Sequence, residues 1–510
     1  MKRIQHALLI ALAGIGLSSC EKYLDINRDP STPQIAEGYT LLPPIIEQMA
    51  LGEQYDSRFI GKYIQNWGHV AANDNWDRHG YDPGSDNAGL IWRVNYWNLG
   101  PNIQLMIDDA TAKQKWEYLG VAHATFAWSW LTTTDYHGEI VLKQAFEPGR
   151  YVFDYDSQED VYAHVNDLCA KALEAFGRTD GIQGANILNK NGADLAYKGD
   201  KSKWVKFVYA VMARAQLHLS NKASFNPDKV IEYCDKSFAS NADNFNVPSA
   251  STGNNTTLNF LGPTRSNYGL YLQTDWLVKL LDGTIMGAKD PRLNILASAS
   301  ADGIFRGVTP TQGDPNNVKG NKQRIPTLWG VVSDSVVTGD PNAGKYIFKD
   351  GADFPLITYS EVQFMKAEAA FKKGDKAMAY DAYKKGIQAA MDFAKVPAAA
   401  ATTYLAGKAV PQTATDLKIS DIMIQKYLAL YGHGVIETWV DMRRYKYSAD
   451  VYPGFTPPAV DKLFPDNNGK LAYRVRPRYN SEYVWNRTSM DKVGGNNLDY
   501  HTYPTWIINP

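Results

Sequence analysis

The feature that most constrains the fold of this chain is a regular spacing of small and aromatic residues between positions 358 and 392. Ala367 and Ala379 are twelve positions apart, Tyr383 follows four positions later, and Gly386 three positions after that. Gly374 separates two stretches with helical periodicity. Small side chains let two antiparallel helices approach closely, and the aromatic ring fills the space towards the next pair. The segment therefore predicts a packed helical pair.

This spacing is that of a tetratricopeptide repeat. One such pair cannot bury its apolar face alone, so other helical pairs are expected to stack against it. The remaining helices show no clear period, and we therefore expect a degenerate array. A generic helical hairpin is the alternative interpretation.

Helical patterns dominate the rest of the chain. Residues 202–220 place apolar side chains at steps of three and four. Residues 155–176 open with Ser157 and Asp160 at capping-box spacing, and the pattern that begins at 114 ends at Gly138. These patterns predict an all-α fold built from tetratricopeptide-like stacked helical pairs.

Loop-rich stretches interrupt the helices at 66–87 and 241–354, where Gly, Pro, Asn, Ser and Thr cluster. Strand-like runs are few and short: "RGVTP" (306–310), "SDSVVT" (333–338) and "LAYRVRP" (471–477). The sequence therefore predicts loop-rich parts and a few short strands in addition to the helices.

The N-terminus has the features of a secretory leader. Lys2 and Arg3 precede an apolar run at 7–17 that is too short to cross a bilayer. Leu17-Ser18-Ser19-Cys20 resembles the bacterial lipobox, whose cysteine is lipidated and becomes the first mature residue. A soluble secreted protein with an incidental cysteine is the alternative. The predicted organisation is a signal peptide (1–19), a lipid-anchor tether (20–40) and a helical domain (41–510).

Composition limits the partners of this chain. It has 53 basic and 54 acidic residues and a net charge of −1, which gives no support to nucleic-acid binding. The other cysteines, Cys169 and Cys234, fall in helical patterns and are predicted to be buried thiols, although a disulfide between them remains an alternative.

A search for catalytic motifs finds no H-E-x-x-H, no G-x-S-x-G and no Cys/His cluster with zinc spacing. Asp135, His137 and Glu139 are adjacent in "TDYHGEI" and are the best argument for a hydrolase, but Gly138 indicates a turn after a helix. We therefore expect no catalytic residues, no cofactor and no metal site.

Candidate ligand-binding residues lie in the first loop-rich stretch. An exposed aromatic face beside amides and charged groups suits sugar rings, and it also suits peptides. Trp329, in the second loop-rich stretch, is a further candidate, whereas Trp92, Tyr96 and Trp97 have helical spacing and are predicted to be core. The candidates are Asn66, Trp67, Asn75, Trp76, Arg78, Tyr81 and Trp329.

Several stretches together resemble the SusD/RagB family of nutrient-binding lipoproteins from Bacteroidetes. They run in the expected order from Cys20 to about Asn486, and Asn480 stands where a proline is common, which puts the local turn in doubt. The stretches are "SCEKYLDINRDP", "NYWNLGPNIQLMIDDA", "TDYHGEIVLKQAFEPGRYVFDYDSQEDVYAHV", "LAYKGDKSKWVKFVYAVMARAQLHLS", "KDPRL", "ITYSEVQFMKAEAAFKKGD", "IQKYLALYGHGVIETWVDMRRYKY" and "RYNSEYVWN".

The resemblance implies an all-α fold of stacked tetratricopeptide-like helical pairs, in which loops and short strands form a lobe that faces the ligand. It also implies a cell-surface lipoprotein, anchored in the outer membrane by lipid on Cys20 and facing the exterior. It further implies a partner, a SusC-like TonB-dependent transporter, to which the protein delivers oligosaccharides while acting as its lid. Ligand residues vary within the family, so the resemblance assigns none here. The alternatives are peptide as the ligand, a surface hydrolase, and a structural scaffold without a soluble ligand.

Overall fold

The computed structural model describes residues 36–250, 257–335 and 343–510. Cys20 and the predicted signal peptide lie outside these residues. Within them, no helix combines the length and the apolar character that crossing a membrane requires.

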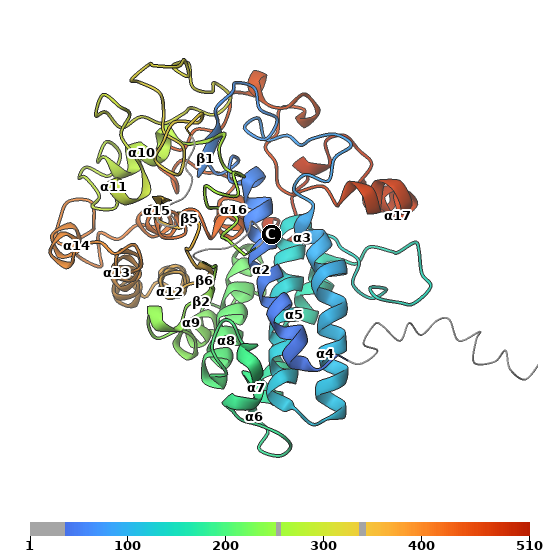
Figure 1. Cartoon of the computed structure of the whole chain (residues 1–510). Coiled ribbons are helices and arrows are strands. Elements are labelled where there is room, and N and C mark those ends of the chain that lie inside the picture. The colour runs from blue at the N-terminus through green and yellow to red at the C-terminus, as the bar shows by residue number, and fades with distance from the viewer. Residues whose placement is uncertain (1–35, 251–256, 336–342) are drawn as a thin grey trace, which may run out of the picture.

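Helices stand side by side in a row of packed pairs (Figure 1). In this row α5 packs on α6, α8 on α9 and α12 on α13, and the pairs meet through α6 with α8 and through α9 with α12. The longer helices are α2 (Gly38–Ile60), α4 (Gly100–Ala112), α5 (Trp116–His137), α6 (Gln158–Gly177), α8 (Lys201–His218), α9 (Pro227–Lys236), α12 (Tyr359–Lys373), α13 (Lys376–Phe393), α15 (Ile419–Ala429) and α16 (Val435–Arg444). The prediction of an all-α fold with stacked helical pairs is confirmed.

The small residues of the predicted pair have the expected role. A Cβ atom on Gly386 of α13 would lie 2.9 Å from the Phe364 ring of α12, so the two helices approach as closely as a glycine allows. Tyr383 packs edge-on against the same ring, with centroids 6.3 Å apart. The cap predictions also hold, because Ser157 Oγ accepts from the Asp160 N–H at the start of α6 and α5 ends before Gly138 at φ +86°.

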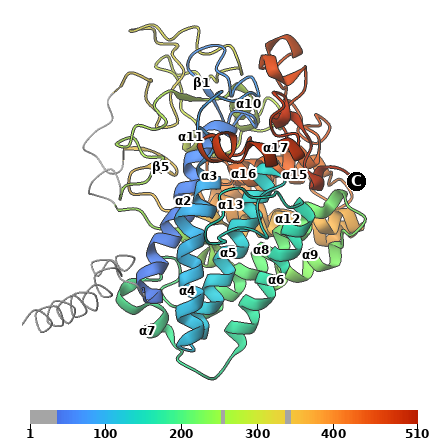
Figure 2. The same cartoon turned by 90° about the vertical axis from the view of Figure 1, so that its right-hand side faces the viewer.

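Short elements fill the lobe above the helices, where β1 and α10 appear in both views (Figures 1 and 2). The antiparallel pair β1–β3 joins the loop after residue 66 to the second loop-rich stretch. The short helices are α3 (Leu90–Arg93), α7 (Ala185–Leu188), α10 (Asp275–Leu281), α11 (Leu293–Leu296), α14 (Ala398–Leu405) and α17 (Arg487–Lys492). The strands are β1 (Trp67–His69), β2 (Phe245–Val247), β3 (Tyr271–Gln273), β4 (Gly344–Lys345), β5 (Phe348–Lys349) and β6 (Phe354–Ile357).

The strand predictions from local sequence were largely wrong. Residues 471–477 form no strand, because their backbone groups bond to separate partners: Arg474 N–H donates to His501 O and Val475 N–H to Tyr136 O. Residues 306–310 make only isolated bridges, and residues 333–338 lie partly outside the described residues.

Two predictions about single side chains had opposite outcomes. Cys169 and Cys234 are buried free thiols, as predicted. Trp97 was predicted to be core but is 74% exposed. In this π-helical turn (Val94–Leu99) Tyr96 packs on Trp92, with ring centroids 4.8 Å apart, and the next side chain points to solvent.

Buried charges join α5, α8, α12, α15 and α16 in what we call the core ion network. Lys426 Nζ lies 3.0 Å from Glu437 and 2.7 Å from Asp441, and the Arg444 guanidinium lies 2.8 Å from Glu368. Since removal of one partner of a buried ion pair leaves an uncompensated charge, these contacts fix how the helices pack. The network consists of Asp135, Arg214, His218, Glu361, Glu368, Lys426, Glu437, Asp441 and Arg444.

His218 lies between two carboxylates of this network. Its Nδ1 is 3.0 Å from Asp135 and its Nε2 is 2.9 Å from Glu437. Burial by itself would lower the pKa of His218, but the two carboxylates outweigh it and raise the pKa from 6.5 to about 9. The folded protein therefore holds a charged imidazolium at neutral pH.

This pKa predicts how stability depends on pH. Because the folded pKa lies above the ordinary value, the contribution of His218 to the free energy of unfolding is complete below pH 6.5 and is lost as the pH rises through about 9. We expect His218→Gln to destabilise the protein by roughly 3 kcal/mol at pH 6 and by much less at pH 9.5, measured by denaturant unfolding.

The control is His123→Gln, since His123 lies outside the network and burial lowers its pKa to about 4. Between pH 7.5 and pH 9.5 that variant should keep the pH dependence of the wild type, because a lowered pKa of a histidine affects stability only near and below pH 6.5. A deficit of His218→Gln that stays constant from pH 6 to pH 9.5 would contradict the charged state of His218.

Candidate functional site

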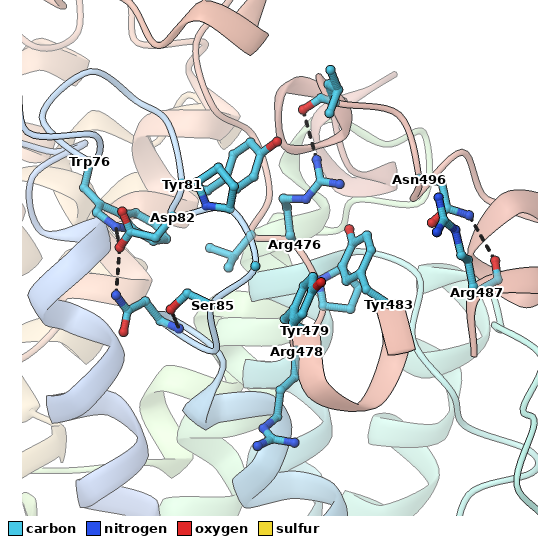
Figure 3. Close-up of a pocket in the computed structure, with 16 residues that line it drawn as sticks. Trp76, Tyr81, Asp82, Ser85, Arg476, Arg478, Tyr479, Tyr483, Arg487 and Asn496 are labelled. Carbon is cyan, nitrogen blue, oxygen red and sulfur yellow. Dashed lines mark hydrogen bonds between the residues drawn. The ribbon is translucent and has the colours of Figure 1, made fainter. Parts of the chain in front are cut away.

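A pocket of about 260 Å³ opens between the loop that precedes α3 and the C-terminal segment around α17; we call it the Tyr479 pocket (Figure 3). Its two walls are nearly 400 positions apart in the sequence, and each is fixed separately to the helices. The residues used below are Trp76, Tyr81, Asp82, Gly84, Arg476, Tyr479, Tyr483, Arg487 and Asn496.

Asp82 organises the loop wall. Its carboxylate accepts hydrogen bonds from Asn75 Nδ2 at 2.9 Å, Trp76 Nε1 at 2.9 Å and Asn87 Nδ2 at 2.7 Å. Trp76 is buried; its ring packs on Phe59 of α2, with centroids 5.0 Å apart, and stacks on Tyr63 just after that helix, with centroids 5.7 Å apart. The loop is therefore anchored to a long helix on one side and closed around a carboxylate on the other.

The C-terminal wall is held at the end of α5 and by α16. His137 Nδ1–H donates to Val475 O at 3.0 Å, and Arg443 Nη1 donates to Tyr473 O at 2.8 Å. Asn480 then joins this wall to the loop, because its backbone N–H and its side-chain amide both donate to Asp86. A proline at this position could not donate from its nitrogen, so Asn480 adds a link between the two walls.

Aromatic rings and one guanidinium form a stack along the C-terminal wall (Figure 3). Arg476 Cζ lies 4.5 Å from the Tyr81 ring centroid and 5.0 Å from that of Tyr483. Tyr483 stacks on Tyr479 with centroids 5.8 Å apart and an interplanar angle of 14°. Tyr479, at the end of the stack, is 36% exposed and lines the pocket.

Gly84 narrows the pocket opposite this ring. It has φ +70°, a conformation that a residue with a Cβ adopts only at a cost, and a Cβ there would lie 3.9 Å from Tyr479 Cζ. Tyr81 is fixed by its hydroxyl, which donates to Asp466 at 2.8 Å; burial raises its pKa to about 12 and keeps it protonated.

Two polar groups of the pocket have no partner among the described residues. The Arg487 guanidinium is exposed and forms no ion pair within them. Asn496 Oδ1 is buried and accepts no hydrogen bond there. A donor and an acceptor are thus free on the side of the pocket away from Trp76, as Figure 3 shows.

The structure places two of the predicted ligand-binding residues, Trp76 and Tyr81, in the wall of this pocket. Asn75 supports the wall through Asp82. Arg78 lies behind it, where its guanidinium donates to the carbonyl oxygens of Lys462 and Leu463.

The other predicted binding residues are packed in the interior. Trp67 is 0% exposed, stands edge-on to Tyr268 at 5.3 Å and donates from Nε1 to Arg58 O. Asn66 is equally buried, and its Oδ1 accepts from the Gly432 N–H. Trp329 is 7% exposed and donates to Leu261 O. Trp67 and Trp329 therefore pack in the interior and have almost no surface that a ligand could contact.

Local sequence analysis missed the C-terminal contribution, namely Arg476, Tyr479, Tyr483, Arg487 and Asn496. The available signal was the spacing of Tyr479 and Tyr483 four positions apart, which stacks the rings within a π-helical turn (Tyr479–Tyr483). Their proximity to the loop at 76–87 depends on tertiary packing alone.

The side chains that favoured a hydrolase do not converge. Asp135 belongs to the core ion network, and His137 is fully buried, which lowers its pKa to about 3. Glu139 pairs with Arg474. Among the described residues, no group of three or more His, Cys, Asp or Glu side chains is arranged to hold a metal ion.

Comparison with known proteins gives one family. The family model named SusD-like, described as starch-binding and associating with the outer membrane, matches residues 30–471. A search of curated proteins found no match.

Solved structures share the fold over nearly the whole chain. A SusD/RagB family protein from Bacteroides thetaiotaomicron is 21% identical, with a TM-score of 0.66 over 93% of this chain and 99% of that one. A SusD homologue from Bacteroides fragilis is 17% identical, with a TM-score of 0.70 over 93% and 100%. A chitin-binding protein is 21% identical, with a TM-score of 0.67 over 92% and 99%.

The geometry of the loop wall leads to a prediction for Asp82. Replacing it with Ala removes the acceptor of three donors, including the buried Trp76 Nε1, and should cost about 1–3 kcal/mol of stability. We expect faster amide hydrogen exchange in residues 75–87, measured by mass spectrometry. Asp461→Ala, at a largely exposed carboxylate, is the control and should change stability by less than about 0.5 kcal/mol. Unchanged exchange in Asp82→Ala would show that the loop is held by other contacts.

Proposed function

The chain belongs to the SusD-like family of starch-binding proteins that associate with the outer membrane, and from this premise we propose that it binds oligosaccharides in the Tyr479 pocket. It hands them to a SusC-like TonB-dependent transporter, over which it acts as a lid, and it carries out no chemistry on them.

The observation that carries this proposal is the partly exposed ring of Tyr479, which lines the pocket at the end of an ordered stack. A sugar ring has a C–H-rich face, which packs on an aromatic ring, and a polar rim. Tyr483 and Arg476 support Tyr479 from behind, so the ring is positioned before a ligand arrives. Pre-organisation of this kind lowers the entropy cost of binding.

The polar groups of the pocket suit the rim of a sugar. Arg487 supplies N–H donors to hydroxyl oxygens, and Asn496 Oδ1 accepts from a hydroxyl. One structural neighbour is a chitin-binding protein, so chito-oligosaccharides are, beside starch fragments, the first ligands to test.

The location follows from the N-terminal sequence. We propose that Cys20 is lipidated and that the segment between Cys20 and the start of α2 at Gly38, slightly shorter than the 20–40 predicted from the sequence, tethers the helical domain to the outer membrane on its external side. Acyl chains contribute about 0.8 kcal/mol for each buried CH₂ group, and two or more chains together hold a protein firmly.

Ligand binding is tested by substitution in the pocket. We expect Tyr479→Ala to weaken binding of oligosaccharides about tenfold, since loss of a central aromatic contact costs more than 1 kcal/mol. Tyr479→Phe, which keeps the ring, should bind like the wild type. Isothermal calorimetry over starch, chitin and peptide oligomers measures both variants.

Trp97→Ala is the matched control, because Trp97 is an exposed aromatic outside the pocket. If Tyr479→Ala and Arg487→Ala retain every tested oligosaccharide as the wild type does, the pocket is not the binding site. Tight binding of peptides alone would change the ligand class, and sustained cleavage by the pure protein would favour a hydrolase.

The anchor is tested by metabolic labelling. We expect labelled palmitate to be incorporated into the wild type and into Cys169→Ala, but not into Cys20→Ala, because Cys169 is a buried thiol. Cys20→Ala should also leave the outer-membrane fraction. A labelled Cys20→Ala protein would place the lipid elsewhere and refute this anchor.

A further inference from the structure

A second and larger pocket, of about 750 Å³, lies beside β5 and the end of α13, on the left of Figure 1, whereas α17 of the Tyr479 pocket is on the right. We call it the Lys395 pocket. Its wall includes Asn246, Ile295, Tyr346, Lys349, Phe393 and Lys395. None of these residues contributes to the Tyr479 pocket.

Lys395 has a backbone conformation that favours glycine. It follows the C-cap of α13 at φ +58°, and the helix closes with hydrogen bonds from Lys395 N–H to Asp392 O and from Val396 N–H to Met391 O. Glycine is the usual residue at this position of the motif. The partner helix α12 ends on Gly374 at φ +90°, so the same helical pair uses glycine at one end and lysine at the other.

Tyr346 is a second residue of this kind. It begins the two-residue turn between β4 and β5 at φ +49°, a position where hairpins of this length favour glycine or asparagine. Its ring stands edge-on to Phe393, with centroids 5.9 Å apart and an angle of 88°. Burial raises the pKa of the Tyr346 hydroxyl, which is therefore a neutral donor.

Asn246, a third polar residue of this pocket, also lies at a backbone irregularity. The pairing of β2 with β6 shifts register between Phe245 and Asn246, and such a bulge re-aims the side chain beside it. Asn246 Oδ1 is buried and has no donor among the described residues. Lys395, Tyr346 and Asn246 thus line one pocket, and each lies at a backbone irregularity: a left-handed conformation for Lys395 and Tyr346, and a bulge for Asn246. The fold alone does not require these side chains at these positions.

The charges of this pocket are unbalanced. Lys349 and Lys395 form no ion pair among the described residues, and neither donates a side-chain hydrogen bond there. Asp353 is the one carboxylate among the described lining residues; it is exposed at the rim, and partial burial raises its pKa. An anion at the lysines would supply their missing counter-charge.

We infer that the Lys395 pocket is a second binding site, which takes a sugar unit carrying a carboxylate or sulfate group. The anionic group would pair with Lys349 and Lys395, hydroxyls would bond to Asn246 and Tyr346, and the C–H face would pack on Phe393 and Ile295. That the ligand is a saccharide rests on the proposed function, whereas its negative charge follows from the pocket itself.

The experiment compares an acidic disaccharide, glucuronyl-glucose, with neutral cellobiose by calorimetry on the full chain in detergent. The acidic sugar should bind at least about tenfold more tightly, since a charge-assisted contact is worth about that factor. Lys349→Ala and Lys395→Gly should each weaken its binding by a similar factor. Asp353→Asn should strengthen it, because a repulsive charge is removed from the rim.

Lys395→Gly separates binding from folding. Glycine suits the left-handed conformation, so this variant should have a Tm at or above that of the wild type while it binds more weakly. A lower Tm would show that Lys395 has a structural role and would overturn the inference. Lys229→Ala, at an exposed lysine of α9 outside the pocket, is the control and should change nothing.

Other outcomes are equally decisive. If the acidic and the neutral disaccharide bind equally tightly, Lys349 and Lys395 do not recognise a negative charge, and the inference is wrong. Inorganic phosphate that competes as well as the disaccharide would indicate a plain anion site and overturn the saccharide assignment. Tyr479→Ala should leave acidic-sugar binding unchanged; if it abolishes that binding instead, the Tyr479 pocket is the site for both ligand classes.

Discussion

The arrangement of this molecule depends on the core ion network, in which charges from α5, α8, α12, α15 and α16 pair in the interior. Such pairs add little net stability, because the loss of hydration offsets their attraction. Their effect is on geometry: any other packing of these helices would leave a buried charge without its partner, at a cost of several kcal/mol. His218, which contacts both Asp135 and Glu437, shows how one side chain joins three helices at a single point.

The helices of the core ion network also hold the two walls of the Tyr479 pocket in place. Arg443 of α16 and His137 at the end of α5 hold the start of the C-terminal wall. Tyr63, just after α2, holds the loop wall by donating to Gly80 O and stacking on Trp76, and its ring packs on Trp439 of α16 with centroids 5.5 Å apart. Because both walls contact α16, which belongs to the core ion network, the pocket rests on a rigid part of the scaffold.

The helices could be predicted well from the sequence. The residues that cap a helix, and the small residues that let two successive helices pack closely, lie near one another in the chain. Ser157, Gly138 and Gly386 each gave a correct prediction for this reason. The candidate binding residues were harder to predict: Trp67 and Trp76 lie in the same polar loop, yet Trp76 borders the Tyr479 pocket and Trp67 does not. Tyr479 could not be associated with that loop from the sequence, since a contact nearly 400 positions long leaves no local pattern.

The charged residues also show what the sequence can and cannot predict. The near balance of 53 basic and 54 acidic residues gives no support to nucleic-acid binding and does not indicate where unpaired charges lie. In the folded chain the basic groups of the core ion network have carboxylate partners, whereas Arg487 borders one pocket and Lys349 and Lys395 border another without any among the described residues. An unpaired cation that borders a pocket can take its missing partner from a ligand. The distribution of partners, and not the net charge, is therefore the basis of both proposed sites.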